Sequence, residues 1–382
     1  VPASSLTGVV LFASATGVTA MDAATGSTLF ARAGVPALGD WSTLFATSAE
    51  GPRTSRETYD SGSGERLSTG RVPDGFGVRI AANDGSQVAL VRGAPAPDDW
   101  TPYPRATTDI LVTDPSGVSP PERYLLEGNF DPEAFSSDGR RLFLLEYVPA
   151  TAPTSYRVTT LDLERGQVSP VFLSHEKRIA ETMSGTRLEQ LAPPDGRYLF
   201  TLYTSEPSAY LGDGSTVREP VAFVHVLDLG NGTAHCIALP EELWGGDPGV
   251  QAMAVSPSGD LLYVADTERG IVAEIATQRG KVRRVASVDF PRSDETHAVV
   301  TDRSRLVVAS GPELVTVDAG ALRPSARHDV GADVRGLGTG DRGLLVSTKE
   351  GVEVLDPTTG ETVDRLPARA SSETAYVGSV DL

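Results

Sequence analysis

Few residues of this 382-residue sequence are candidates for catalysis or metal binding. The histidines are the first residue type to consider. They are too scattered to predict a metal site, because ligand sets for a bound metal recur at short, fixed spacings. His297 is the one catalytic candidate: it opens a short apolar strand, residues 297–301, with Asp294 just before it and Asp247 near the start of the preceding unit. The five histidines are His175, His225, His235, His297 and His328.

Other signatures of catalysis are absent from the sequence. No HExxH, Walker A or Gly-x-Ser-x-Gly pattern occurs. His225 lies between two valines of an alternating strand, which favours a sheet histidine with its hydrogen bonds satisfied. His235 and Cys236 are neighbours in a strand and point to opposite faces, so they do not form a nucleophile and base pair. Because Cys236 is the single cysteine, an intrachain disulfide and a cysteine-built metal site are excluded.

A second set of candidates is aromatic or basic and lies in long, proline-containing stretches, residues 92–108, 148–155, 173–190, 204–220 and 240–251. Aromatic and arginine side chains are enriched at binding hot spots, and prolines reduce the entropy lost when a loop is ordered on binding. An alternative interpretation is that these side chains anchor insertions on the body of the protein. The candidate binding residues are Trp100, Tyr103, Arg105, Tyr156, His175, Tyr210, Arg218 and Trp244.

The charge balance limits the partners. The formal net charge of −18 opposes binding to nucleic acid or to an anionic membrane surface, because neutralising phosphates needs clustered cations. With 40% hydrophobic and 22% charged residues, the chain can bury a large core. No apolar run approaches the length of a membrane span, so direct insertion of this segment is not expected. Lysine is rare beside arginine, which suggests an actinobacterial, GC-rich genome.

The elements that position these residues are given by an internal repeat. An Asp at the end of an alternating strand is followed four residues later by Gly, and successive copies lie about 48 residues apart on average. An Asp in such a turn accepts backbone N–H bonds, so we interpret these residues as turn builders and not as metal ligands. Five copies are clear: Asp22 to Gly26, Asp60 to Gly64, Asp162 to Gly166, Asp228 to Gly232 and Asp356 to Gly360. Three are degenerate: Asp114 with Gly117, Asp318 with Gly320, and Ala276 before Gly280.

Each repeat contains four short strands separated by turns, with almost no helical periodicity. Radial repetition of four-stranded antiparallel sheets makes a β-propeller. We therefore predict an all-β fold, a single β-propeller domain over residues 1–382, with eight blades and seven as the alternative. The first unit starts at its second strand, residues 9–14, and the segment 375–382 is left over after the eighth unit. We expect these terminal strands to pair and to close the propeller.

Residues 252–280, AMAVSPSGDLLYVADTERGIVAEIATQRG, resemble one blade of the YVTN or YncE-like propellers. Asp22 to Gly26 and Asp356 to Gly360 resemble the Asp-x-x-Thr-Gly turns of quinoprotein-type repeats. The resemblance implies blades and specifies no chemistry. The Trp-Asp marks of WD40 blades are missing, and Phe30 stands where quinoprotein dehydrogenase repeats end in Trp, which disfavours both subfamilies.

Loop lengths point to a binding face. In a four-stranded blade, the loops between strands two and three emerge on the same face as the links between blades. These loops are long in units three to five and tight in units one, six, seven and eight. We therefore predict a non-catalytic binding or scaffold propeller that recognises a protein or glycan through the loops over blades three to five. Loops held by a rigid scaffold are the usual place of function in such folds. We also expect a monomer without a cofactor.

Two alternatives remain at this stage. The first is a lactonase- or lyase-like propeller enzyme that acts at the central channel with calcium or another divalent metal. The second is a propeller that forms one domain of a longer, membrane-anchored receptor. We expect a location in the cell envelope or outside the cell, with the signal or anchor outside this sequence, because residues 1–8 do not resemble a leader. A cytoplasmic location is the alternative.

Overall fold

The computed structural model describes residues 8–14, 17–33, 43–50, 53–60, 64–93, 103–116, 118–173, 182–193, 195–204, 222–245, 248–302, 305–340, 343–367 and 376–381. Within these ranges the helices are three short 3₁₀ turns, η1 (Glu241–Leu243), η2 (Pro248–Val250) and η3 (Thr277–Arg279). None of the described helices has the length and apolar character needed to span a bilayer.

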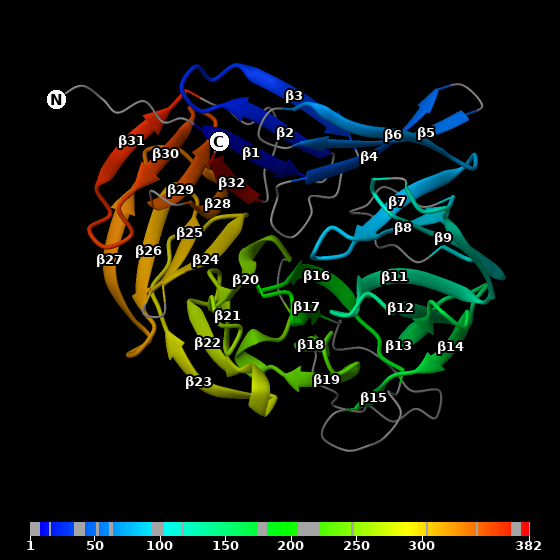
Figure 1. The fold of residues 1–382 in the computed structure, drawn as a ribbon. Coiled ribbons are helices and arrows are strands. Elements are labelled where there is room, and N and C mark those ends of the chain that lie inside the picture. The colour runs from blue at the N-terminus through cyan, green and yellow to red at the C-terminus, as the bar shows by residue number, and fades with distance from the viewer. Residues whose placement is uncertain are drawn as a thin grey trace. The chain divides into compact units, whose positions relative to one another are not determined.

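The strands are short and follow one another along the chain with few interruptions (Figure 1). The first half contains β1 (Gly8–Ser14), β2 (Gly17–Asp22), β3 (Thr28–Ala33), β4 (Thr43–Glu50), β5 (Arg53–Asp60), β6 (Arg66–Val72), β7 (Phe76–Ala81), β8 (Val88–Arg92), β9 (Thr107–Thr113), β10 (Glu122–Glu127), β11 (Asn129–Phe135), β12 (Arg141–Val148), β13 (Ser155–Asp162), β14 (Gln167–Pro170) and β15 (Phe172–Leu173). The second half contains β16 (Thr186–Leu191), β17 (Tyr198–Thr204), β18 (Ala222–Asp228), β19 (Thr233–Ala238), β20 (Gln251–Val255), β21 (Leu261–Asp266), β22 (Ile271–Ala276), β23 (Lys281–Ser287), β24 (Thr296–Asp302), β25 (Arg305–Ser310), β26 (Glu313–Asp318), β27 (Arg323–Asp329), β28 (Val334–Gly340), β29 (Gly343–Thr348), β30 (Val352–Leu355), β31 (Thr362–Leu366) and β32 (Tyr376–Asp381).

In the described residues these strands form eight sheets, six of four strands, one of five and one of three. Each sheet is built mainly from consecutive strands, as in the order β20-β21-β22-β23, and the described pairings are antiparallel. The fold class is therefore the eight-bladed β-propeller, and the predicted number of blades is confirmed. The sheet with the order β3-β2-β1-β32 joins the first and last strands, so the predicted pairing of the terminal strands is also confirmed.

The predicted turn builders have the expected geometry. The Gly26 amide donates to the carbonyl oxygen of Asp22 at 2.8 Å, and the Thr25 amide donates to Oδ1 of Asp22 at 2.7 Å. Gly26 has φ of 68°, a left-handed conformation that glycine adopts without strain. Asp162 and Asp356 accept turn N–H bonds in the same way. The repeated Asp residues hold turns, as the sequence indicated.

One degenerate copy closes differently from the prediction. The turn after Asp318 is completed by Leu322, whose amide donates to the carbonyl oxygen of Asp318 at 2.7 Å. Leu322 has φ of 49° and is the one described residue other than glycine with positive φ. A left-handed conformation costs about 1–2 kcal/mol for an L-residue. Leu322 is 2% exposed, and burying a leucine contributes a comparable stabilisation, about 1.5–3 kcal/mol.

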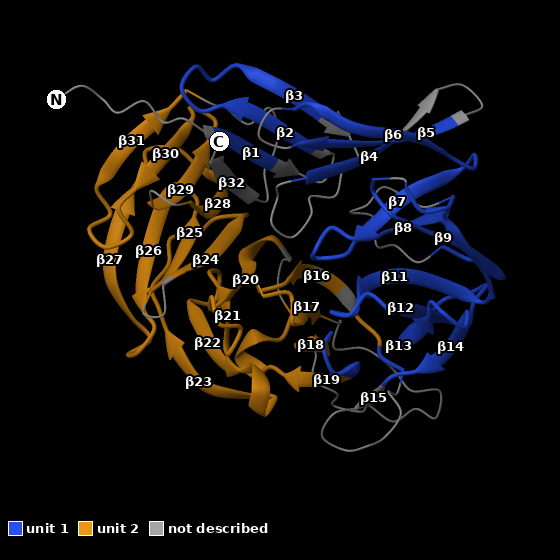
Figure 2. Cartoon of the chain, in the orientation of Figure 1, with its two compact units in different colours: residues 1–183, 229–233, 379–382 blue, residues 184–228, 234–378 orange. Residues whose placement is uncertain are grey.

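Figure 2 shows the two compact units into which the chain divides, residues 1–183, 229–233 and 379–382 as unit 1 and residues 184–228 and 234–378 as unit 2. The single-domain organisation stays a prediction. In unit 1, successive sheets share apolar cores: Leu11 packs with Leu44 and Tyr59, and Val91 packs with Leu142. These contacts remove the faces of neighbouring sheets from water.

In unit 2, consecutive residues of one strand serve two different cores. On β21, Leu262 and Val264 belong to the cluster with Phe200 of β17, whereas Tyr263 belongs to the cluster with Val308 of β25. Side chains alternate between the two faces of a strand, so a strand buried on both faces reads as a continuous apolar run. The outermost strand β23 instead alternates exposed and half-buried residues.

Candidate functional site

A segment of unit 1, residues 103–106, ends the long connection between β8 and β9, and a buried side chain fixes it. Asn129 opens β11 and has no exposed surface. Its Nδ2 donates to the carbonyl oxygens of Tyr103 and, at 3.1 Å, of Ala150. Its Oδ1 accepts a hydrogen bond of 2.7 Å from Nε of Arg105. One amide therefore ties the segment 103–106 and the loop after β12 to the first strand of a blade.

We call the hydrogen bonds of Asn129 to Tyr103, Arg105 and Ala150 the Asn129 clamp. The side chains of Tyr103 and Arg105 face different environments. Tyr103 is 45% exposed although its backbone carbonyl is bound to Asn129. Arg105 is half-buried, and its backbone amide donates to Ala150 at 3.1 Å. Burial is the largest influence on Arg105 and lowers the pKa of its guanidinium, while the charge of Asp131 acts in the opposite direction. The segment thus contains an exposed tyrosine and, two residues further along the chain, a partly desolvated cation.

The carboxylate next to Arg105 already belongs to another cation. Nε and Nη2 of Arg79 on β7 donate to the two oxygens of Asp131 on β11 at 2.9 and 2.7 Å. The side chains of Arg79 and Asp131 are 0% and 5% exposed. Both oxygens of Asp131 thus accept a hydrogen bond from Arg79, whereas its influence on Arg105 is through charge.

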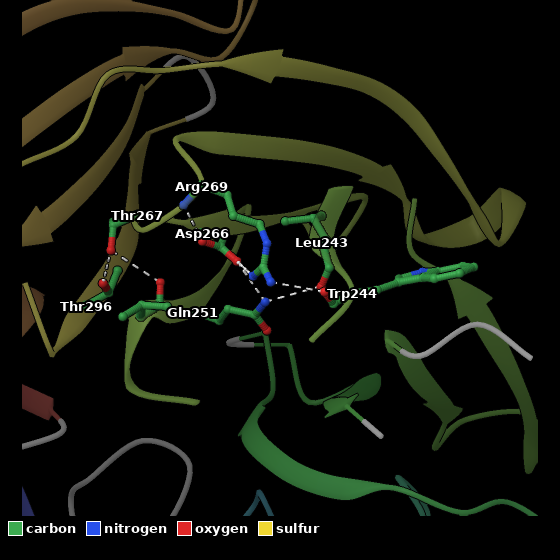
Figure 3. A network of polar contacts seen from close by, with 8 residues as sticks. Leu243, Trp244, Gln251, Asp266, Thr267, Arg269 and Thr296 are labelled. Carbon is green, nitrogen blue, oxygen red and sulfur yellow. Dashed lines mark hydrogen bonds and ion pairs between the residues drawn. The ribbon is translucent and has the colours of Figure 1, made fainter. Parts of the chain in front are cut away.

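Unit 2 contains a comparable polar network in which both terminal nitrogens of the arginine donate hydrogen bonds (Figure 3). Asp266, at the end of β21, is fully buried and accepts from Nε2 of Gln251 at 2.9 Å and from Nη1 of Arg269 at 2.8 Å. Nη2 of Arg269 donates to the carbonyl oxygen of Trp244 at 3.1 Å. The Trp244 ring packs against the apolar cluster around Phe200, and its Nε1 donates to the carbonyl oxygen of Leu239. The predicted binding residue Trp244 therefore also has a structural role.

A cavity of about 550 Å³ lies near this network in unit 2. It is formed by the tight loops β21–β22 and β25–β26 together with the links that precede β20, β24 and β28. Nε2 of His297 lies 3.3 Å from Oε1 of the lining residue Glu295, and the imidazole is 11% exposed. The lining residues are Val250, Glu268, Arg292, Ser293, Asp294, Glu295, Gly311, Pro312, Asp333 and Val334.

The predicted site residues thus fall into separate places. Tyr103 and Arg105 lie together, and Asp294 lines the cavity beside the His297–Glu295 pair. Tyr156 is buried, with its ring edge-on to Tyr147 at 6.4 Å between centroids. The other candidates lie outside the described residues: Trp100, His175, Tyr210, Arg218 and Asp247.

The pKa values of His225 and Glu189, both in the sheet that contains β16 to β18, are shifted. Burial lowers the pKa of His225 to about 3, with a further contribution from His235. The imidazole is therefore neutral, and among the described residues its Nδ1 has no hydrogen-bond partner, so the prediction of a histidine with satisfied hydrogen bonds is not met at this atom. Burial raises the pKa of Glu189 on β16 to about 7, against the opposing effect of the Met253 amide that donates to it. Within the described ranges, no three His, Cys, Asp or Glu side chains are arranged to hold a metal ion.

No protein-family model and no curated protein matches the chain. Among solved structures, the dihydro-heme d1 dehydrogenase NirN in complex with DHE is similar to it, with a TM-score of 0.53 and 14% identity over 100% of this chain and 76% of that chain. The hydrazine synthase of Kuenenia stuttgartiensis has a TM-score of 0.45 and 15% identity, covering 83% of this chain and 90% of that chain. BamB from Moraxella catarrhalis has a TM-score of 0.44 and 13% identity, covering 90% and 94%. These neighbours are β-propellers of diverse function, and the likeness shows the fold alone.

Proposed function

We propose that this chain is a non-catalytic binding propeller that recognises a protein or glycan partner through the loops over blades three to five. The observation that carries the proposal is the Asn129 clamp. The side chain of Tyr103 is exposed, and its backbone carbonyl is held by the fully buried amide of Asn129. Binding loses less conformational entropy when the contacting segment is already ordered. Tyrosine and arginine, the residue types at positions 103 and 105, are also enriched at binding hot spots.

The clamp gives this surface a rigid support. Asn129 belongs to β11, which pairs along its length with β12, and Ala150 follows β12 in the chain. The hydrogen bonds of Asn129 therefore connect the segment 103–106 to two strands of a blade. A site built on strands holds its geometry more closely than a site on an untethered loop.

The experiment replaces Tyr103 with a photo-crosslinking phenylalanine and, separately, with Ala. We expect a covalent adduct with a partner from source-cell extract, or retention on a glycan array, and at least a tenfold loss of capture for Tyr103→Ala with an unchanged melting temperature. Leu125 is the matched control position. It is 68% exposed on β10, which belongs to the same sheet as β9, the strand that follows the segment 103–106. Equal capture by Tyr103→Ala and the native chain would show that this surface is not the binding site.

A second candidate function is supported by the His297–Glu295 contact at the edge of the acidic cavity. A carboxylate beside an imidazole is an arrangement used in general acid–base catalysis. This candidate is a lactonase- or lyase-like enzyme that uses calcium or another divalent metal. Metal analysis of the purified protein and hydrolysis of a lactone panel test it. Stoichiometric metal with turnover that His297→Ala abolishes would favour the enzyme over the binding module.

The setting of the protein is also a proposal. We expect a monomer that works in the cell envelope or outside the cell, with blades related to the YVTN or YncE-like propellers of actinobacteria. The net charge of −18 supports a protein that does not bind nucleic acid. Fractionation of source cells with an antibody against the chain tests the location, and sedimentation equilibrium tests the oligomeric state.

A further inference from the structure

The guanidinium of Arg105 is only partly used by the fold. Its Nε donates to Asn129, which fixes the plane of the fork. In the part of the chain that the structure describes, no group accepts a hydrogen bond from Nη1 or Nη2. By contrast, Arg157 donates Nε and Nη2 to the carboxylate of Glu146, and Arg123 donates the same two nitrogens to Asp109. Arg105 is thus an oriented cation with its terminal donors still available.

The largest charge effect on Arg105 from within the described residues is that of Asp131. Both oxygens of Asp131 accept hydrogen bonds from Arg79, and its charge opposes the effect of burial on the Arg105 guanidinium. Burial is the larger of the two effects, so Arg105 is a partly desolvated cation. A partly desolvated cation gains more from a bound anion than a fully solvated one does.

We propose that Arg105 binds the carboxylate of a uronic-acid sugar through Nη1 and Nη2, an inference that rests on the proposed binding function and names its ligand class. A planar guanidinium pairs with a carboxylate through two parallel hydrogen bonds. The exposed ring of Tyr103, two residues away, offers an apolar surface against which a sugar ring packs. A partner rich in acidic groups is disfavoured by the net negative charge, whereas an isolated carboxylate on a neutral saccharide is not.

The substitution Arg105→Gln separates the two roles of this side chain. The Nε2 of glutamine occupies the same place along the side chain as Nε of arginine, so the bond to Asn129 is retained and only the terminal nitrogens are lost. Arg123→Gln is the matched control: Arg123 is 54% exposed, and its partner Asp109 keeps Arg92. Arg105→Lys restores the charge without the fork.

The test is a titration with three probes: sodium glucuronate, an otherwise neutral oligosaccharide that carries a single glucuronic acid, and an acetylated glutamate peptide. In the native chain it follows the side-chain ¹⁵Nε–H resonance of Arg105, and in every variant it follows the side-chain ¹⁵Nδ2–H₂ resonances of Asn129, which the substitutions leave in place. We expect the Arg105 resonance to shift with the two sugars, about tenfold or more weaker binding in Arg105→Gln, partial recovery in Arg105→Lys and no change in Arg123→Gln. Binding should weaken with added salt.

Three results would overturn the inference: no response to any carboxylate, sugar binding that survives Arg105→Gln, or equal binding of the peptide and the sugars. The proposed binding function is judged separately. If Tyr103 crosslinks a partner while Arg105→Gln has no effect on carboxylate binding, the inference fails and the binding function stands. If Tyr103→Ala changes nothing while Arg105 still binds glucuronate, the anion site stands and the wider binding surface fails.

Discussion

Arg105 of unit 1 and Arg269 of unit 2 both lie in connections between strands, but only Arg269 donates from both of its terminal nitrogens to described acceptors. Arg269 gives Nη1 to the buried Asp266 and Nη2 to the carbonyl oxygen of Trp244. Arg105 gives Nε to Asn129 and has no described acceptor for its terminal nitrogens. The same residue type therefore has two roles: Arg269 completes a structural network, and Arg105 presents donors to a ligand.

Glu189 is the reverse case in unit 2. It is a carboxylate on β16 that accepts a hydrogen bond from the Met253 amide. Burial shifts its pKa upward, toward the neutral acid, because no opposite charge compensates. An arginine cannot lose its proton at physiological pH, so Arg105 instead remains charged and gains from an external anion.

The largest effect should come from the network of Gln251, Asp266 and Arg269. Asp266→Ala leaves the buried Gln251 amide and the Arg269 guanidinium without their acceptor, so we expect the free energy of unfolding to fall by about 3 kcal/mol. Urea denaturation measures this through the midpoint at constant slope. A loss below about 1 kcal/mol would show that the network is not a stabilising element.

Asn129→Ala should have the next largest effect. It removes three hydrogen bonds of a fully buried side chain and releases the segment 103–106, so we expect a loss of about 2–3 kcal/mol in the free energy of unfolding. Partner capture should fall together with stability, even below the melting temperature. Hydrogen exchange at the Arg105 amide, which donates to Ala150, provides the local readout. Unchanged protection there would contradict the clamp.

Glu189→Gln tests the raised pKa of Glu189 through the pH dependence of the free energy of unfolding. The folded pKa of about 7 lies above the ordinary value of 4.5, so the stabilisation due to the neutral acid is full below about pH 4.5 and is lost as the pH rises through 7. Glutamine keeps an acceptor for the Met253 amide and does not ionise. We expect the variant to gain about 2 kcal/mol relative to the native chain between pH 5 and pH 8. Parallel stability profiles over this range would contradict a raised pKa.

The blades were predictable from the sequence because their signals are local. An Asp and a Gly four residues apart form one turn, and an apolar run buried on both faces forms one strand. The alternatives arose at degenerate copies such as Asp318, where Leu322 adopts the conformation that glycine takes elsewhere. Tyr103 and Arg105 were among the candidates because aromatic and basic residues in a proline-containing loop are visible as a composition.

Asn129 was not predicted, because its partners are backbone carbonyls 21 and 26 residues away and a sequence pattern contains no record of them. The available signal was an asparagine directly after Gly128 at the start of a strand. The cavity in unit 2 was missed for a related reason. Tight loops gave no sign of it, although residues from five connections line one space. The burial of Tyr156 depends on the packing of Tyr147 across the sheet.

The most direct test of the account compares Arg105→Gln with Arg269→Gln by urea unfolding. Arg105→Gln retains the bond to Asn129 and should change the free energy of unfolding by no more than about 0.5 kcal/mol. Arg269→Gln leaves the buried Asp266 without its cation and should cost about 2 kcal/mol or more. Equal costs for the two substitutions would contradict the claim that Arg105 is held for a ligand while Arg269 is held for the fold.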